Sequence, residues 1–168
     1  MKNLYDSLAW ENCLGVEILE ILWTYYLLKQ QVPNYDDTFS NLRENKFIQL
    51  LVNDIILRLC KFRDKDSRSI SFEQAKKKLE KKNKVKSQNQ YLDKILKKYR
   101  DHTINLEKHR DSYIAHLSKR DRIHLKPTIE IFTAIKMAVQ IVDSLCGEKN
   151  AYRLEKIDLR VEVLGDKA

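Results

Sequence analysis

Glycine and proline are scarce in this 168-residue chain, which contains 3 glycines and 2 prolines. Average usage would give about 12 glycines and about 8 prolines. Tight turns depend on both residues, so the shortage argues against a β-sandwich, a β-barrel and a fold built on a glycine-rich nucleotide-binding loop. The length is that of one domain, and 43% hydrophobic with 33% charged residues fits a soluble, mainly helical protein rather than a disordered one.

Cysteine is also scarce, and Cys13, Cys60 and Cys146 lie far apart, each within an apolar run. The sequence has no CxxC pair and no secretory signal, so we expect buried, unpaired thiols in a reducing cytoplasm. The most apolar stretch, residues 14–28, carries two glutamates and is too short to span a bilayer. We therefore expect a soluble cytoplasmic protein without a membrane partner.

Positive charge is unevenly distributed along the chain. The formal net charge is +8 and the pI is near 9.3. Residues 76–86 contain seven lysines and one glutamate, and residues 97–126 contain nine Lys or Arg against four Asp or Glu. The remainder is mildly acidic, and such a basic centre indicates an anionic partner, nucleic acid before membrane. A lysine-rich, solvated surface explains the same composition and stays open as the alternative.

Apolar residues recur at helical spacing in five segments, which predicts an all-α bundle of four to five helices. We expect helices over about residues 4–28, 39–62, a short segment after 71, 90–117 and 128–146. The first of these is apolar on two sides, so we place it at the centre of the bundle.

Local signals mark several helix ends. Ser71 and Gln74 have the spacing of a capping box that opens the third helix. Pro127 suits the first turn of the last helix, and Gly147 suits its C-cap. The lysines of residues 76–86 look exposed and mobile, and would offer phosphates a loose electrostatic contact.

The C-terminal tail has a different pattern, because apolar and charged residues alternate from Ile157 to Val163. A period of two predicts a short strand, paired with a symmetry mate or lying extended over the bundle. We accordingly divide the chain into a helical domain, residues 1–150, and a C-terminal extension, residues 151–168.

Two charged residues, Asp54 and Arg58, interrupt the most apolar half of the second helix. Their separation of four residues allows them to pair on one helix face. An internal ion pair is the simpler interpretation, and support for a functional site is the alternative.

His102, His109 and His116 recur every seven residues, a spacing that suggests a metal stripe. Seven helical residues rise about 10.5 Å, whereas a zinc ion needs its ligand nitrogens about 2 Å away. Consecutive members of the stripe therefore cannot share an ion, and we expect no local metal site. The sequence also lacks a glycine-rich phosphate loop and a nucleophile elbow.

Arg110 and His116 remain as candidates for chemistry, in the most basic stretch that we expect to be folded. Arginine offers phosphate oxygens a planar, permanently charged fork, and histidine exchanges a proton near neutral pH. RNA carries its own nucleophile, the 2′-hydroxyl, so a base and a cation suffice in principle without a metal or another cofactor.

The spacing alone leaves the geometry of this pair open. Six helical residues separate two side chains by about 9 Å along the axis and about 120° around it. The long arginine side chain spans part of that gap. Alternatively, Asp111 is a helix N-cap with Arg110 just outside the helix, or two chains present their copies across one cleft. An exposed helix face with a surface histidine is the simplest interpretation of the spacing.

The segment from Arg110 to His116 resembles the R-x(4–6)-H motif of the HEPN superfamily, the "higher eukaryotes and prokaryotes nucleotide-binding" helical domains. A polar residue after the arginine, here Asp111, and a small residue before the histidine, here Ala115, are typical of that motif. Residues 53–59 and 69–72 look like the abortive-infection branch of the superfamily. The similarity covers roughly residues 4–146, although only the short segments are specific.

The resemblance implies a homodimeric helical bundle with apposed motifs, and a metal-independent endoribonuclease of toxin or phage-defence type. It implies that Arg110 binds the scissile phosphate, that His116 is general base or acid, and that Asp111 orients one of them. Asp54 and Arg58 are candidates for supporting the site. Our candidates for RNA binding are Lys108, His109, Tyr113, Lys119 and Arg120. Tyr113 suits stacking on a base, but equally a dimer interface or the core.

One departure from the family pattern concerns regulation. Family toxins silenced by nucleotidyltransferase antitoxins usually carry a tyrosine two residues past the histidine, where this chain has Ser118. We therefore do not expect that form of control, and we keep an antitoxin or another regulatory protein among the partners that the resemblance implies. The alternative function is a non-catalytic nucleotide- or RNA-binding or protein-interaction module, and a DNA-binding protein ranks lower because no helix-turn-helix pattern is evident.

Overall fold

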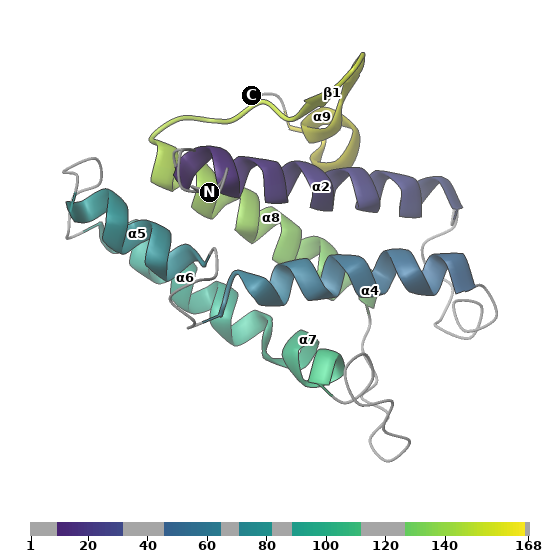
Figure 1. Cartoon of the computed structure of the whole chain (residues 1–168), viewed down its shortest axis with the longest axis horizontal. Coiled ribbons are helices and arrows are strands. Elements are labelled where there is room, and N and C mark those ends of the chain that lie inside the picture. Colours follow the sequence, from purple (N-terminus) through teal and green to yellow (C-terminus); the bar gives the residue numbers. More distant parts are fainter. Residues whose placement is uncertain (1–9, 32–45, 65–70, 82–88, 112–126, 167–168) are drawn as a thin grey trace, which may run out of the picture.

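The computed structural model describes residues 10–31, 46–64, 71–81, 89–111 and 127–166, and most of them are helical (Figure 1). The long helices are α2 (Trp10–Gln31), α4 (Lys46–Lys61), α5 (Phe72–Lys81), α6 (Gln90–His102) and α8 (Pro127–Cys146). The short elements are α7 (Ile104–His109), β1 (Arg153–Leu154), β2 (Ile157–Asp158) and α9 (Leu159–Leu164). The predicted all-α bundle with a short β segment in its tail is confirmed. Within the described residues, no helix is long and apolar enough to cross a membrane.

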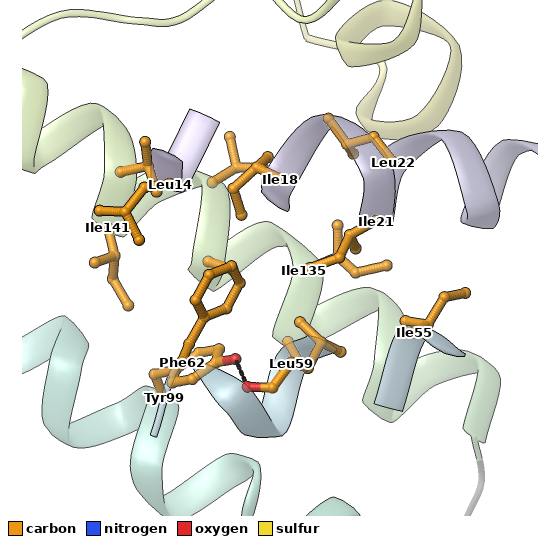
Figure 2. Close-up of a cluster of buried hydrophobic side chains, with 14 of the residues drawn as sticks. Leu14, Ile18, Ile21, Leu22, Ile55, Leu59, Phe62, Tyr99, Ile135 and Ile141 are labelled. Atoms are coloured by element: carbon orange, nitrogen blue, oxygen red, sulfur yellow. Dashed lines mark hydrogen bonds between the residues drawn. The ribbon is translucent and has the colours of Figure 1, made fainter. Parts of the chain in front are cut away.

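Helix α2 is central, as its two apolar sides predicted. It packs against α4, α8 and α9, while α6 packs against α8 on the other side of the core. Figure 2 shows Ile18 and Leu22 of α2 near Ile135 of α8, above Leu59 of α4. All four of these side chains are fully buried. Because the hydrophobic effect scales with the apolar area removed from water, this shared cluster is the main source of the bundle's stability.

The cysteines lie where their apolar surroundings predicted. Cys13 and Cys60 are buried, Cys146 is partly buried, and all three are free thiols. Burial raises the pKa of the Cys60 thiol to about 11, so this thiol stays neutral at physiological pH.

Two of the predicted caps are visible at the ends of their helices. The backbone N–H of Gln74 donates to Ser71 Oγ over 3.4 Å, which is one half of a capping box at the start of α5. Gly147 has φ +79°, and its N–H donates to the Asp143 carbonyl at the end of α8. Such a left-handed conformation favours glycine, which explains why α8 stops there.

The lysine-rich segment differs in part from the prediction of an exposed, mobile run. Residues 76–81 belong to α5, and Lys76 is largely buried between Asp93 and Glu80. The hydrogen bond to Asp93 raises the pKa of Lys76, so the ammonium is retained as part of the α5–α6 contact. Residues 82–86 lie outside the described residues.

The single helix predicted over residues 90–117 is interrupted at Thr103. This residue is fully buried, and its hydroxyl donates to the Tyr99 carbonyl over 2.7 Å. A threonine that bonds back to the carbonyl four residues earlier tends to bend a helix. The chain therefore ends α6 at His102 and starts α7 at Ile104 in a new direction (Figure 1).

The strand predicted from Ile157 to Val163 was wrong beyond Asp158. Strand β2 pairs antiparallel with β1 in a small hairpin, and residues 159–164 form α9. Asp158 caps this helix, since its side chain accepts from the backbone N–H groups of Arg160 and Val161. Leu159 and Val163 are buried in the main core, and their separation of four residues suits a helix face as well as an alternating strand.

Candidate functional site

Arg110, the arginine of the sequence motif, follows directly after α7. Its φ and ψ are −53° and −51°, and its backbone N–H donates to the carbonyls of Leu106 and Glu107. Arg110 and Asp111 continue the helix as a π-turn. Arg110 thus lies inside a helical turn, which does not support the alternative in which it lies outside a helix that Asp111 caps.

Two carboxylates hold the Arg110 guanidinium. Its Nε donates to Asp111 Oδ1 over 2.7 Å, and its Nη2 lies 2.7 Å from the same oxygen. Glu107 Oε1 lies 3.7 Å from Nη2, one helical turn earlier. Burial lowers the pKa of Arg110, but the Asp111 hydrogen bond and the nearby carboxylates outweigh it and raise the pKa above its ordinary value. The guanidinium is consequently a fixed positive charge, with 31% of its side chain exposed.

Glu107 connects this site to the end of α4. Its Oε2 lies 2.7 Å from Nη1 of Arg63, whose side chain is only 16% exposed. Helices α4 and α7 pack together here, and Cys60 is close enough to Arg110 for each to affect the other's pKa. One carboxylate therefore lies between two guanidinium groups, and together with Asp111 the cluster carries two positive and two negative charges. The guanidinium groups still suit an anion such as phosphate, because their planar forks bind two of its oxygens.

The other predicted site residues have varied surroundings. Lys108 is exposed, whereas His109 is 7% exposed and its burial lowers its pKa. A direct contact between His109 and RNA would require this side chain to leave the interior. The remaining candidates, Tyr113, His116, Lys119 and Arg120, lie outside the described residues.

Asp54 and Arg58 form the predicted pair, with Arg58 Nε 2.9 Å from Asp54 Oδ2. Both turn toward α2, where Arg58 Nη1 meets Glu17 over 3.2 Å and Thr24 donates to Asp54. Arg58 and Arg63 are five residues apart, which is about 140° around a helix that continues ideally. The structure therefore brings Asp54 and Arg58 to the α2–α4 contact and not to the guanidinium of Arg110.

Sequence reasoning missed Glu107 and Arg63. The separation of three residues between Glu107 and Arg110 was a usable signal, because helical neighbours at that distance pair. Arg63 gave no comparable signal, since its contact depends on how α4 packs against α7.

The sequence matches a family model, AbiU2 of the HEPN domains, over residues 10–154. The chain therefore belongs to the HEPN family, in its abortive-infection branch. Comparisons with curated proteins and with solved structures gave no match. The match spans the described helices α2 to α8 and includes Arg110, the cluster around it and the sequence from Arg110 to His116.

Proposed function

We propose that this chain is a metal-independent endoribonuclease of toxin or phage-defence type. The observation that carries the proposal is Arg110, a permanently charged guanidinium held by Asp111 and Glu107 in a chain of the abortive-infection branch of the HEPN family. Its charge, fixed orientation and partial exposure suit the binding of a scissile phosphate. RNA is the substrate class because it supplies the 2′-hydroxyl that the reaction needs.

In the proposed reaction, His116 is general base or acid. As the base, it takes the proton of the 2′-hydroxyl, and the oxygen attacks the adjacent phosphorus. The bond from phosphorus to the 5′ oxygen breaks, and that oxygen leaves with a proton taken from a solvent water. Arg110 stabilises the extra negative charge on the phosphorane, and Asp111 orients the guanidinium. The products are a 2′,3′-cyclic phosphate and a 5′-hydroxyl.

We further propose that the site is composite, with Arg110 and His116 donated across a homodimer. About 9 Å of axial separation within one ideal helix makes it hard for one chain to place both groups on one phosphate. Two chains related by a two-fold axis present the same motif to each other, which brings Arg110 of one chain close to His116 of the other.

The direct test is RNA cleavage by the full chain and by His116→Ala and Arg110→Ala. We expect cleavage with cyclic phosphate ends from the wild type, unaffected by excess chelator, and none from either variant, with the helical content of all three unchanged. Loss of cleavage in chelator would point to a metal nuclease. Binding of RNA whose length never changes would favour the non-catalytic module instead.

A further inference from the structure

A cleft of about 440 Å³ lies beside the candidate site, between the end of α4, the start of α5 and the last turns of α6. The residues that line the cleft do not include Arg110, Asp111 or His116 of the proposed chemistry. Figure 1 shows α5 and α6 side by side, with the C-terminal end of α4 next to them. The volume is in the range of small-ligand sites, and the lining includes the apolar side chains of Phe62, Phe72, Leu96 and Tyr99.

The inner wall of the cleft is formed by packed aromatic rings. The rings of Phe62 and Phe72 stack with centroids 4.4 Å apart, and Tyr99 packs edge-on against Phe72 at 5.2 Å. The Tyr99 hydroxyl donates to the Leu59 carbonyl, the dashed line in Figure 2. These three rings are almost completely buried. A ligand therefore enters a preformed cleft, and little ordering of the wall is needed on binding.

The rim of the cleft is polar and carries both signs of charge. Lys77 is exposed on α5, and Arg100 of α6 pairs with Glu73 over 2.7 Å. About half of each of the paired side chains is exposed, so the pair contributes little energy and an anion can compete for Arg100. Asp64 and Gln74 add polar groups that suit the edge of a nucleobase.

Arg63 joins the cleft to the candidate catalytic cluster. It lines the cleft, and its guanidinium binds one oxygen of Glu107 while Arg110 faces the other. The two guanidinium groups are thus separated by a single carboxylate. An RNA backbone whose phosphate binds Arg110 therefore finds a second guanidinium, that of Arg63, beside the first. The apolar part of the cleft follows directly after Arg63.

We propose that this cleft holds a nucleotide of single-stranded RNA next to the phosphodiester on Arg110. Its base enters the recess, and its phosphate contacts Lys77, Arg63 and Arg100. This inference rests on the proposed function, since it names a substrate subsite of the same nuclease. The cleft then selects which phosphodiester is positioned for cleavage, because an occupied recess fixes the register of the strand.

The test compares two charge reversals, Lys77→Glu at the rim and Lys97→Glu on the exposed face of α6 outside the cleft. Both change the net charge equally, so a difference between them reports position. In the non-cleaving His116→Ala background, we expect Lys77→Glu to weaken binding of a mixed-sequence single-stranded RNA about tenfold. Lys97→Glu should change it less than about twofold. Adenosine 5′-monophosphate should shift the amide NMR signals of Gln74, Lys77 and Arg100 in the wild type.

The proposed subsite would be overturned if Lys77→Glu and Lys97→Glu weakened RNA binding equally. It would also be overturned if adenosine 5′-monophosphate left the amide NMR signals of the cleft residues unchanged. Displacement of the RNA by an acidic, phosphate-free peptide with the same Lys77 dependence would assign the cleft to a protein ligand and also overturn it. Cleavage by the wild-type chain is scored separately. If the wild type cleaves RNA but the two lysine variants weaken binding equally, only the proposed subsite is wrong. If Lys77→Glu weakens binding selectively but the wild type does not cleave RNA, the proposed nuclease activity is wrong and nucleotide recognition in the cleft still holds.

Discussion

Arg110 contacts Asp111 through both its Nε and its Nη2 nitrogen, each 2.7 Å from the same carboxylate oxygen. The two residues are neighbours in the chain and lie together in the π-turn that follows α7. One edge of the guanidinium is used by Asp111. Because Asp111 holds Nε and Nη2, it also fixes the direction of the remaining nitrogen, Nη1.

The first prediction concerns this contact. Asp111→Asn keeps an acceptor oxygen but removes the charge that strengthens the bond, so we expect RNA cleavage, measured as kcat/KM, to fall about tenfold. Stability should hardly change, because 53% of the Asp111 side chain is exposed. Asp101→Asn, at an exposed position on α6, is the matched control. A similar fall in both variants would mean that the effect is one of net charge and not of orientation.

The second prediction tests the composite site by mixing. Arg110→Ala and His116→Ala should each be inactive, but an equal mixture that exchanges subunits should recover about a quarter of wild-type activity. Half of the dimers then contain one chain of each kind, and one of their two sites has both groups intact. Light scattering and a tag on one variant measure the mixed dimers. Their formation without any recovery of cleavage would contradict a site that takes Arg110 from one chain and His116 from the other.

Sequence periodicity predicted the bundle because α2, α4 and α8 each bury a continuous apolar face. It failed in the tail because Leu159 and Val163 fit both a period of two and a helical turn, and only the Asp158 cap distinguishes the two. The motif arginine was visible, whereas Arg63 was not, because its ion pair with Glu107 exists only when α4 packs against α7. Tertiary contacts of this kind leave no periodic trace in one sequence.

The third prediction follows from the buried histidine of α7. Burial lowers the folded-state pKa of His109 below its ordinary value of 6.5. As the pH falls through that value, the unfolded chain takes up a proton before the folded chain does, so the stability that neutral His109 contributes is lost. Above about pH 7 that stability is fully present. We expect this loss to reach at most about 1.4 kcal/mol per pH unit.

Urea unfolding at a series of pH values measures this loss. His109→Gln does not titrate in this range, so its free energy of unfolding should fall less between about pH 7.5 and pH 5 than that of the wild type. Parallel curves for the two proteins would show that His109 carries no such linkage, and would place the pH dependence in other groups.

The fourth prediction concerns the attachment of the C-terminal segment. Arg160 is 2% exposed, and its two terminal nitrogens contact Asp143 over 3.2 and 2.9 Å. Nη1 also donates to the Asn150 carbonyl, and Nη2 to Asp166. This network joins α8 to α9, and α9 also buries Leu159 and Val163 in the main core. A chain that ends at residue 150 would lose all of these contacts, so we expect the extension to be needed for a stable bundle.

Arg160→Met should lower the free energy of unfolding by about 3–5 kcal/mol, because it leaves the Asp143 carboxylate, 15% exposed, without its cationic partner. Asp166→Ala should cost much less, since that side chain is 45% exposed and Asp143 keeps its pair. Adding Asp143→Leu to Arg160→Met should recover much of the loss, because two apolar groups replace the buried pair without leaving a charge behind. If the double variant is instead less stable than Arg160→Met, then Asp143 stabilises the end of α8 through Asn150, whose backbone N–H donates to it, more than through Arg160.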